Sequence, residues 1–261
     1  MTTKQPFASE RTVVRHLDRQ FRRVDTPIMI ASHIVALGAS RGFPSLLTLV
    51  RTGLGEVTII DDQMVEEENL GQTLYATTHL NRLKVDAARE MILERAPDTK
   101  VTTFPCRGED VPNLLTLMAA ADLVKIGIDA PRMMFTFADM AQAAGTAAVV
   151  HGMTGDGQQH FAALVYPGGP TLRDILPEAW NAVTAGYEPP TFFPSCALHT
   201  ETMNAAVAMI IAGYLHHRAG SSVELMTGIG AGIVEAGLAT GFYGYHEPSR
   251  FLTPIYFGQP D

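Results

Sequence analysis

The pattern of apolar positions alternates between short β-branched runs and longer segments with helical spacing. The first apolar run covers residues 28–37, and a second one covers 57–61. Between them lie a turn, over 38–42, and a segment with helical spacing over 44–52, whose proline stands at a position that helices tolerate. The order strand, glycine turn, helix, strand predicts a β-turn-α-β unit.

The same alternation continues through the next ninety residues or so, and it predicts further helices over 83–95, 111–119 and 133–144 and further strands over 101–104, 122–128 and 147–151. Strands joined by helical segments of this length need right-handed crossovers, which place the strands parallel to one another. We therefore expect an α/β fold of the Rossmann-like, doubly wound type with a mainly parallel sheet.

The pattern changes after residue 151. A strand over 159–166 directly follows a turn, which predicts an antiparallel addition to the sheet. Six prolines fall within 167–198, and we interpret this stretch as an irregular crossover loop. A helix is expected over 200–218, and the glycine-rich segment 228–244 fits no single element.

The N-terminal segment is predicted to form a helical arm. Residues 9–23 have the spacing of a basic amphipathic helix, which we expect to pack on the main domain or on a second subunit. No internal repeat divides the chain, so we interpret 1–261 as one domain, with the arm over 1–25 and the proline-rich loop over 167–198.

The amino-acid composition argues against some classes of function but does not select one. Hydrophobic residues make up 46% of the chain and charged residues 18%, as in ordinary globular proteins. The formal charge of -8 disfavours nucleic acid as a partner, because binding a polyanion requires a basic surface. There is no apolar run long enough for a signal peptide or a membrane span, so a cytoplasmic protein without membrane contact is expected.

Cysteine and histidine usage argues against a zinc site. The two cysteines, Cys106 and Cys196, are ninety residues apart and form no CxxC pair. The histidines, among them His151, show no spacing that places two ligands on one helical face, and we assign them structural or surface roles.

The glycine turn and the acid after the second strand form a candidate nucleotide site. Gly38, Ser40 and Gly42 lie where backbone amides and a helix dipole can approach phosphate oxygens. Asp61 closes the second strand 23 residues after Gly38, which suits hydrogen bonds with ribose hydroxyls. An ordinary strand-helix turn followed by a solvated aspartate fits the same residues.

The residues after Asp61 resemble a known signature. The segment IIDDQMVEEENLGQTLYATTHLNRLKVDAA is similar to that of the ThiF/E1 superfamily, in which an acid is followed by Asn-Leu, by Arg-Gln and by a lysine opening the next helix. Two further segments, ADLVKIGIDAP and FFPSCALH, resemble the strand before the family's Asp-Asn pair and its late cysteine loop. The resemblance covers roughly residues 30–215.

This resemblance implies an enzyme that uses ATP and Mg²⁺ to adenylate the C-terminal carboxylate of a ubiquitin-like or sulfur-carrier protein, or a related peptide or small-molecule carboxylate. It also implies a homodimer. Carried over by position, Asp61 would bind ribose, Asn69 and Lys84 would contact phosphates, and Asp129 would hold Mg²⁺ through ATP. Asp129 and Lys84 would then serve catalysis, because negative charge builds on the departing phosphates.

The chain departs from this pattern at two places. Gln72 stands where the family has a phosphate-binding arginine, so the resemblance places it at the ATP phosphates without the charge, and Ala130 stands where an asparagine follows the magnesium-binding aspartate. Arg41, or an arginine of the N-terminal arm such as Arg15 or Arg19, is a candidate replacement for the lost charge.

Cys196 occupies the late cysteine loop. Some relatives use this cysteine as an acceptor that forms a thioester with the carrier, and a helix start near Thr200 would lower the pKa of the thiol. A buried free cysteine explains the same residue.

Two other functions stay open. One is an E1-like pseudoenzyme that binds a protein partner, because Gln72 and Ala130 remove expected groups. The other is a short-chain dehydrogenase, because LGASRGF resembles the glycine turn of that family. The required Tyr-x-x-x-Lys pair is missing from the sequence, which argues against the dehydrogenase.

Overall fold

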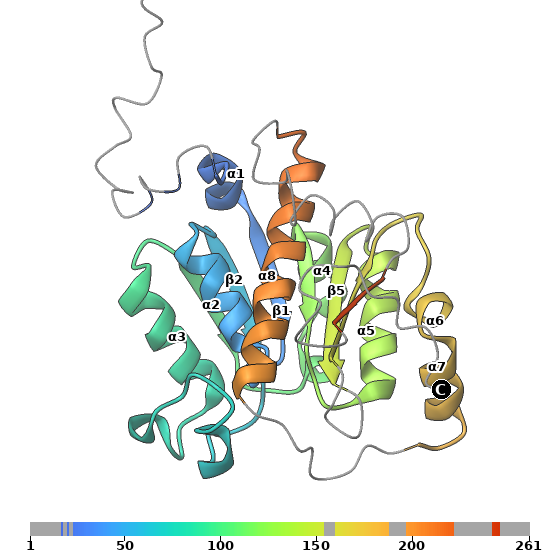
Figure 1. The fold of residues 1–261 in the computed structure, drawn as a ribbon, viewed down its shortest axis with the longest axis horizontal. Helices are drawn as coiled ribbons and strands as arrows, with labels where there is room; N and C mark the ends of the chain where they lie inside the picture. Colours follow the sequence, from blue (N-terminus) through green and yellow to red (C-terminus); the bar gives the residue numbers. More distant parts are fainter. Residues whose placement is uncertain are drawn as a thin grey trace, which may run out of the picture.

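The computed structural model describes Leu17, Gln20 and residues 23–153, 160–187, 197–221 and 242–245. Its centre is a seven-stranded sheet in the order β3-β2-β1-β4-β5-β6-β7. The first five strands are parallel, and β6 and β7 are antiparallel additions, so the predicted fold class is confirmed (Figure 1). The strands are β1 (His33–Leu37), β2 (Glu56–Ile60), β3 (Lys100–Phe104), β4 (Leu123–Ile126), β5 (Ala147–Met153), β6 (His160–Val165) and β7 (Phe242–Tyr245).

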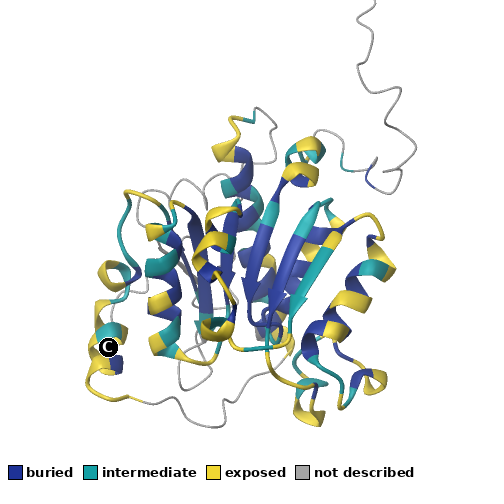
Figure 2. Ribbon diagram, turned by 180° about the vertical axis from the view of Figure 1, so that it is seen from behind, coloured by how far each residue is buried: buried dark blue, intermediate teal, exposed yellow. Residues whose placement is uncertain are grey.

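Helices cover both faces of this sheet. One apolar core joins the sheet to α2, α3 and α8, and a second core joins the opposite face to α4, α5, α6 and α7. Figure 2 shows the central strands as a buried layer, the edge strand β3 as mostly intermediate, and exposed residues on the outward sides of the helices. The helices are α1 (Thr26–Ala31), α2 (Phe43–Arg51), α3 (Lys84–Arg95), α4 (Leu114–Ala119), α5 (Pro131–Ala143), α6 (Leu172–Ile175), α7 (Pro177–Thr184) and α8 (Ala197–Arg218).

The strand order places a switch point between β1 and β4. From β1 the chain continues outward to β2 and β3 on one side, and then returns to build β4 and β5 on the other. The loops after β1 and β4 therefore leave the sheet in opposite directions and open a crevice at the carboxyl ends of the strands. Ligands of doubly wound proteins bind at such crevices.

Two predicted segments were wrong in part. The apolar run 28–37 contains a short helix, α1, and only its second half forms β1. Pro27 lies in the first turn of α1, where its missing amide hydrogen costs no hydrogen bond. Length and hydrophobicity alone did not separate the two elements.

The proline-rich stretch 167–198 is not irregular throughout. Its first part forms α6 and α7, because Thr171 and Asp174 make a reciprocal capping box and Pro177 occupies the first turn of α7. The predicted arm over 9–23, apart from isolated positions, and most of 228–244 lie outside the described residues. In the part of the chain that the structure describes, no helix is long and apolar enough to cross a membrane.

Helix α8 is connected to the glycine turn by one buried side chain. Asn204 accepts a hydrogen bond from the Ser45 amide at 3.1 Å through Oδ1. Its Nδ2 donates to the Arg41 carbonyl at 2.8 Å and to the Thr200 carbonyl at 2.7 Å. Because Asn204 is only 2% exposed, water cannot replace these bonds, and the start of α2 is held against α8.

Replacing Asn204 with alanine should therefore destabilise the protein. The substitution removes three hydrogen bonds and leaves buried backbone groups unsatisfied, so we expect the free energy of unfolding to fall by about 2–4 kcal/mol. Chemical denaturation checks this, with Asn181→Ala on the exposed side of α7 as the matched control. Equal stability of the two variants would contradict the assigned role.

Candidate functional site

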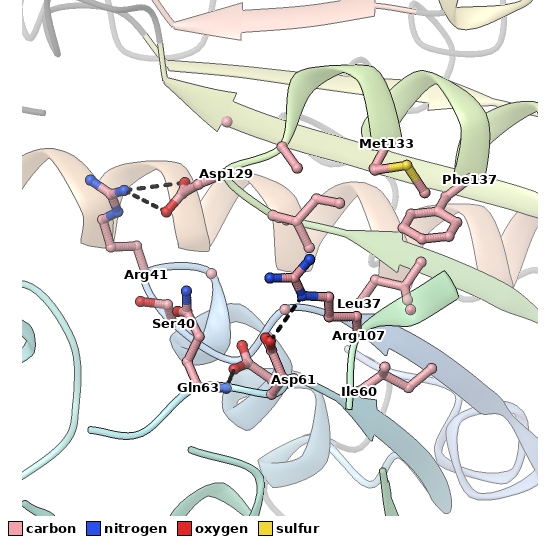
Figure 3. Close-up of a pocket in the computed structure, with 18 of the residues that line it drawn as sticks. Leu37, Ser40, Arg41, Ile60, Asp61, Gln63, Arg107, Asp129, Met133 and Phe137 are labelled. Atoms are coloured by element: carbon pink, nitrogen blue, oxygen red, sulfur yellow. Dashed lines mark hydrogen bonds and ion pairs between the residues drawn. The ribbon is translucent and has the colours of Figure 1, made fainter. Parts of the chain in front are cut away.

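A cavity of about 370 Å³ opens at the carboxyl ends of β1, β2 and β4 (Figure 3). It lies at the switch point, between the glycine turn after β1 and the loop after β4. Five of the predicted site residues line it, namely Gly38, Ser40, Gly42, Asp61 and Asp129. These five residues, from three separate loops, thus lie together at one cavity.

The glycine at position 38 is required by a close contact between the two loops. Its φ is +94°, and a Cβ atom there would lie 2.1 Å from the carbonyl oxygen of Gly127. Any side chain would force the two loops apart, so only glycine permits this approach. The amide of Gly38 also donates to the Ile60 carbonyl at 2.9 Å, which continues the pairing of β1 with β2.

Two backbone amides hold the carboxylate of Asp61 next to the glycine turn. One carboxylate oxygen accepts the amide of Ala39 at 2.7 Å, and the other accepts the amide of Gln63 at 2.9 Å. Burial raises the pKa of Asp61, and these two amides and the charge of Lys84 oppose that effect. The side chain is thus held in one orientation at the cavity, with lone pairs left to accept hydrogen bonds from hydroxyl groups.

Lys84 stands behind the cavity wall rather than in it. The side chain is buried, and its Nζ donates to Oε1 of Gln63 at 2.7 Å. Gln63 lines the cavity, and Lys84 is close enough to Asp61 to lower the pKa of that carboxyl. Lys84 therefore acts on the cavity electrostatically in this structure, with no direct exposure to it.

Asn69 and Gln72 lie outside the cavity lining. The Asn69 side chain accepts the amide of Glu66 at 2.9 Å and so caps the short 3-10 helix over 67–69. The carbonyl of Gln72 accepts the hydroxyl of Thr200 on α8 at 3.3 Å. These two residues shape the loop between β2 and α3, and a role in phosphate binding stays a prediction for both.

Two ion pairs border the cavity. Arg41 binds both oxygens of Asp129 at 3.1 and 3.2 Å, with Asp129 largely exposed and Arg41 mostly covered (Figure 3). Arg107 contacts Asp62 at 3.3 Å, and both of these side chains are exposed to solvent. Arg41 thus lines the cavity, as its candidacy for the missing charge requires, whereas Arg15, Arg19 and the loop cysteine Cys196 lie outside the described residues.

Tyr75, which the sequence analysis did not single out, supports the glycine turn. Its hydroxyl donates to the carbonyl of Ala39 at 2.5 Å and lies 3.2 Å from the carbonyl of Lys84. Its ring stacks on Phe43 with the ring centroids 5.8 Å apart. Burial raises the pKa of Tyr75, and the nearby charge of Asp61 adds to this, so the hydroxyl stays protonated as a donor.

Lys125 and His151 were also missed as site residues. Lys125 is fully buried on β4, and within the described ranges its Nζ has no hydrogen-bond partner. His151, on the neighbouring strand β5, is 2% exposed and lines the cavity. Lysine is rarely buried unpaired, so a lysine in the middle of an apolar strand pattern was the signal available in the sequence.

The arrangement belongs to a general class: a doubly wound α/β protein whose cavity lies where nucleotides bind in this fold. A model of the ThiF family matches residues 29–238, which is most of the chain. The protein therefore belongs to the ThiF family, and the short-chain dehydrogenase alternative is set aside.

Two characterised relatives indicate the kind of protein that this chain is similar to. "Adenylyltransferase and sulfurtransferase UBA4" of Meyerozyma guilliermondii is 32% identical over 180 residues, which cover 67% of this chain and 42% of the relative. "SAMP-activating enzyme E1" of Haloferax volcanii is 29% identical over 153 residues, covering 58% of this chain and 56% of the relative. The chain thus spans about half the length of these relatives.

A solved structure supports the fold. Escherichia coli MccB, determined with ATP, superposes with a TM-score of 0.60 over 74% of this chain and 58% of that chain. The sequence identity is 16%, so this likeness concerns the arrangement of helices and strands.

Replacing Tyr75 with phenylalanine tests the support of the turn. The variant keeps the stacked ring but leaves the buried carbonyl of Ala39 without its donor, so we expect the free energy of unfolding to fall by about 1–3 kcal/mol. Denaturant unfolding measures this. Tyr187→Phe is the matched control, because Tyr187 is exposed. A loss no larger than that of the control would show that the hydroxyl does not support the turn.

Lys125 predicts a pH dependence of stability. Burial lowers the pKa of Lys125 from 10.5 to about 7 in the folded protein. Between these pH values the unfolded chain binds a proton that the folded chain does not, so this group makes stability rise with pH. Lys125→Met removes the free-energy cost of taking the proton off the buried lysine on folding. The variant should therefore raise the free energy of unfolding at pH 7 by roughly 2–5 kcal/mol.

This gain should shrink as the pH rises from about 7 toward 10.5, because the lysine becomes neutral in both states only above the pKa of the unfolded chain. The test is to record unfolding curves of wild type and Lys125→Met at about one-unit intervals from about pH 6 to about pH 10. The difference in the free energy of unfolding between the two proteins is then plotted against pH. A pH-independent difference would show that Lys125 is charged, and compensated, in the folded state.

Proposed function

We propose that this protein binds ATP in the switch-point cavity and adenylates a carboxylate. The observation that carries the proposal is Asp61, which is fixed against the glycine turn at the cavity in a chain of the ThiF family. Ribose hydroxyls can donate to its oxygens, and the glycine turn before α2 lines the cavity where phosphate oxygens would lie.

The substrate that fits best is the C-terminal carboxylate of a ubiquitin-like or sulfur-carrier protein, with a related peptide or small-molecule carboxylate as the other members of the class. The support is the similarity to an adenylyltransferase and sulfurtransferase and to an E1 enzyme. In the reaction, a carboxylate oxygen attacks the α-phosphorus of ATP, the bond between the α- and β-phosphates breaks, and pyrophosphate leaves with its electron pair. The product is an acyl adenylate.

Charge placement decides whether this chemistry is efficient. Pyrophosphate departs with additional negative charge, so cations near the β- and γ-phosphates stabilise the transition state. Arg41 lines the cavity and would contribute once the phosphates compete with Asp129 for its guanidinium. Lys84 would contribute through its position behind Gln63.

Mg²⁺ fits the mouth of this cavity. Asp129 offers an exposed carboxylate, and Mg²⁺ is commonly bound by one or two carboxylates together with phosphate oxygens. When bound, the ion would neutralise phosphate charge and orient the triphosphate. The side chain of Arg41 would be released from Asp129 and become available to the nucleotide.

Cys196 and a second subunit complete the proposal. A thiol in the segment before α8 would accept the activated acyl group as a thioester, with AMP as the leaving group. A homodimer would allow the N-terminal arm of one subunit to reach the cavity of the other. Both features rest on the family resemblance.

The test is calorimetric titration of ATP in the presence of Mg²⁺, followed by carrier-dependent exchange of pyrophosphate into ATP. We expect Asp61→Asn to weaken ATP binding about tenfold or more, because a carboxylate that accepts ribose hydroxyls is lost. Asp129→Asn should reduce exchange and its Mg²⁺ dependence. Asp98→Asn, on the exposed loop before β3, is the control and should leave both unchanged.

The outcomes separate two functions. Binding without exchange, for every carrier tried, would favour a nucleotide-binding pseudoenzyme, a function for which Gln72 and the Arg41–Asp129 pair argue. Absence of ATP binding by the folded wild type at millimolar concentration would overturn the enzyme and leave a protein-binding subunit as the account.

A further inference from the structure

Lys125 is a fully buried lysine on a strand whose other residues are apolar. Its neighbours along β4 belong to the apolar cores, and the residue itself is 0% exposed. Among the described residues, no carboxylate forms an ion pair with it, and its Nζ has no hydrogen-bond partner. Such a group destabilises the folded protein unless an anion accompanies it.

The position of Lys125 connects it to the cavity. It shares the face of β4 with Leu123, which packs toward α2 and α8. A Cβ atom on Gly42, the residue before α2, would lie 2.8 Å from Nζ of Lys125 and 2.3 Å from Cε1 of His151. Gly42 and His151 both line the cavity, so the ammonium lies directly behind two of its wall residues.

Gly42 and Gly127 keep this space open. A Cβ atom on Gly127 would lie 2.3 Å from Nε2 of His151. The imidazole therefore occupies the space that side chains at Gly42 and Gly127 would fill. The wall between Lys125 and the cavity therefore consists of one ring and the backbone of the turn. Because this wall is thin and little water lies within it, a positive charge on Lys125 would interact strongly with an anion in the cavity.

The remaining cations of the cavity have carboxylate neighbours. Arg41 binds Asp129, and Arg107 contacts Asp62. The position at which the family carries a phosphate-binding arginine is Gln72, which lies outside the lining. Lys125 is, within the described part of the chain, a basic side chain near the cavity that forms no ion pair with a carboxylate.

We propose that Lys125, acting through His151 of β5 beside the start of α2, supplies the positive charge that binds the phosphates of the nucleotide. The inference rests on ATP binding as proposed above and names a residue that replaces the charge lost at Gln72. The phosphates are favoured as the anion because the glycine turn before α2 lines the cavity at the same place, with Ser40 and Gly42 among its lining residues. Lys125 is a positioning residue, since His151 and Gly42 stand between it and the ligand.

Binding of a phosphate should also protonate the lysine. Burial lowers its pKa to about 7, and a nearby anion opposes that effect. The imidazole of His151 from β5 and the backbone of Gly42, just before α2, both lie close to its Nζ. At pH 8 the free protein therefore holds mostly neutral lysine, and the complex with ATP should hold the charged form.

The experiment compares adenosine, AMP and ATP as ligands of the full-length protein. Calorimetry at pH 8, in two buffers with different ionisation enthalpies, gives each affinity and the number of protons taken up. For wild type we expect ATP to bind at least about tenfold more tightly than adenosine, with uptake of up to about one proton. Lys125→Met should lose most of this preference and the proton uptake while binding adenosine as wild type does.

Lys100→Met is the control, because Lys100 is an exposed lysine on β3 that pairs with Glu56. It should retain the preference of wild type for ATP. Unchanged adenosine binding by Lys125→Met also shows that the cavity of that variant is folded, so a lost preference reports the missing charge.

Two results would overturn the inference. If Lys125→Met keeps both the ATP preference and the proton uptake, the phosphates are held by other groups, and ATP binding as proposed stands without Lys125. If wild type binds neither adenosine nor ATP, the nucleotide site itself fails, and the inference fails with it. The Asp61→Asn variant distinguishes the cases, because it loses adenosine binding only where the site exists.

Discussion

The contact between Gly38 and the carbonyl of Gly127 is the constraint on which the site depends. It brings the loop after β1 against the loop after β4 at the point where the strand order reverses. Asp61 accepts a hydrogen bond from the amide of Ala39, and Tyr75 donates one to its carbonyl, so both side chains fix the glycine turn. The cavity thus forms because the backbones of these two loops lie in contact. Hydrogen bonds to the glycine turn then position Asp61 and Tyr75.

The two arginines that line the cavity are each paired with a carboxylate before any ligand enters. Arg41 is matched by Asp129 and Arg107 by Asp62, while the amide side chain of Gln63 separates Lys84 from the cavity. A polyphosphate must exchange these internal partners for its own oxygens, so the net gain from each arginine is smaller than an isolated guanidinium would give. Lys125 differs in this respect, because the folded chain gives it no carboxylate to exchange within the described ranges.

Much of the fold followed from local patterns. The β-branched runs and the glycine turn predicted the parallel strands, and Asp61 was recognised because the end of the second strand is a defined position in this topology. The division of 28–37 into α1 and β1 was missed, since both elements are apolar and only Pro27 marks the helix. The helices of the proline-rich stretch depend on capping by Thr171, a signal that is weak beside six prolines.

The roles of Lys125 and His151 could not be predicted from spacing. They lie 26 residues apart in the sequence and meet only because β4 and β5 are adjacent strands and Gly42 has no side chain. The same reason explains Asn204, whose partners are 159 and 163 residues away. Through Asn204 and Thr200, the first turns of α8 hold both the glycine turn and the Gln72 loop. A shift of these first turns of α8 would therefore displace the glycine turn and the Gln72 loop together.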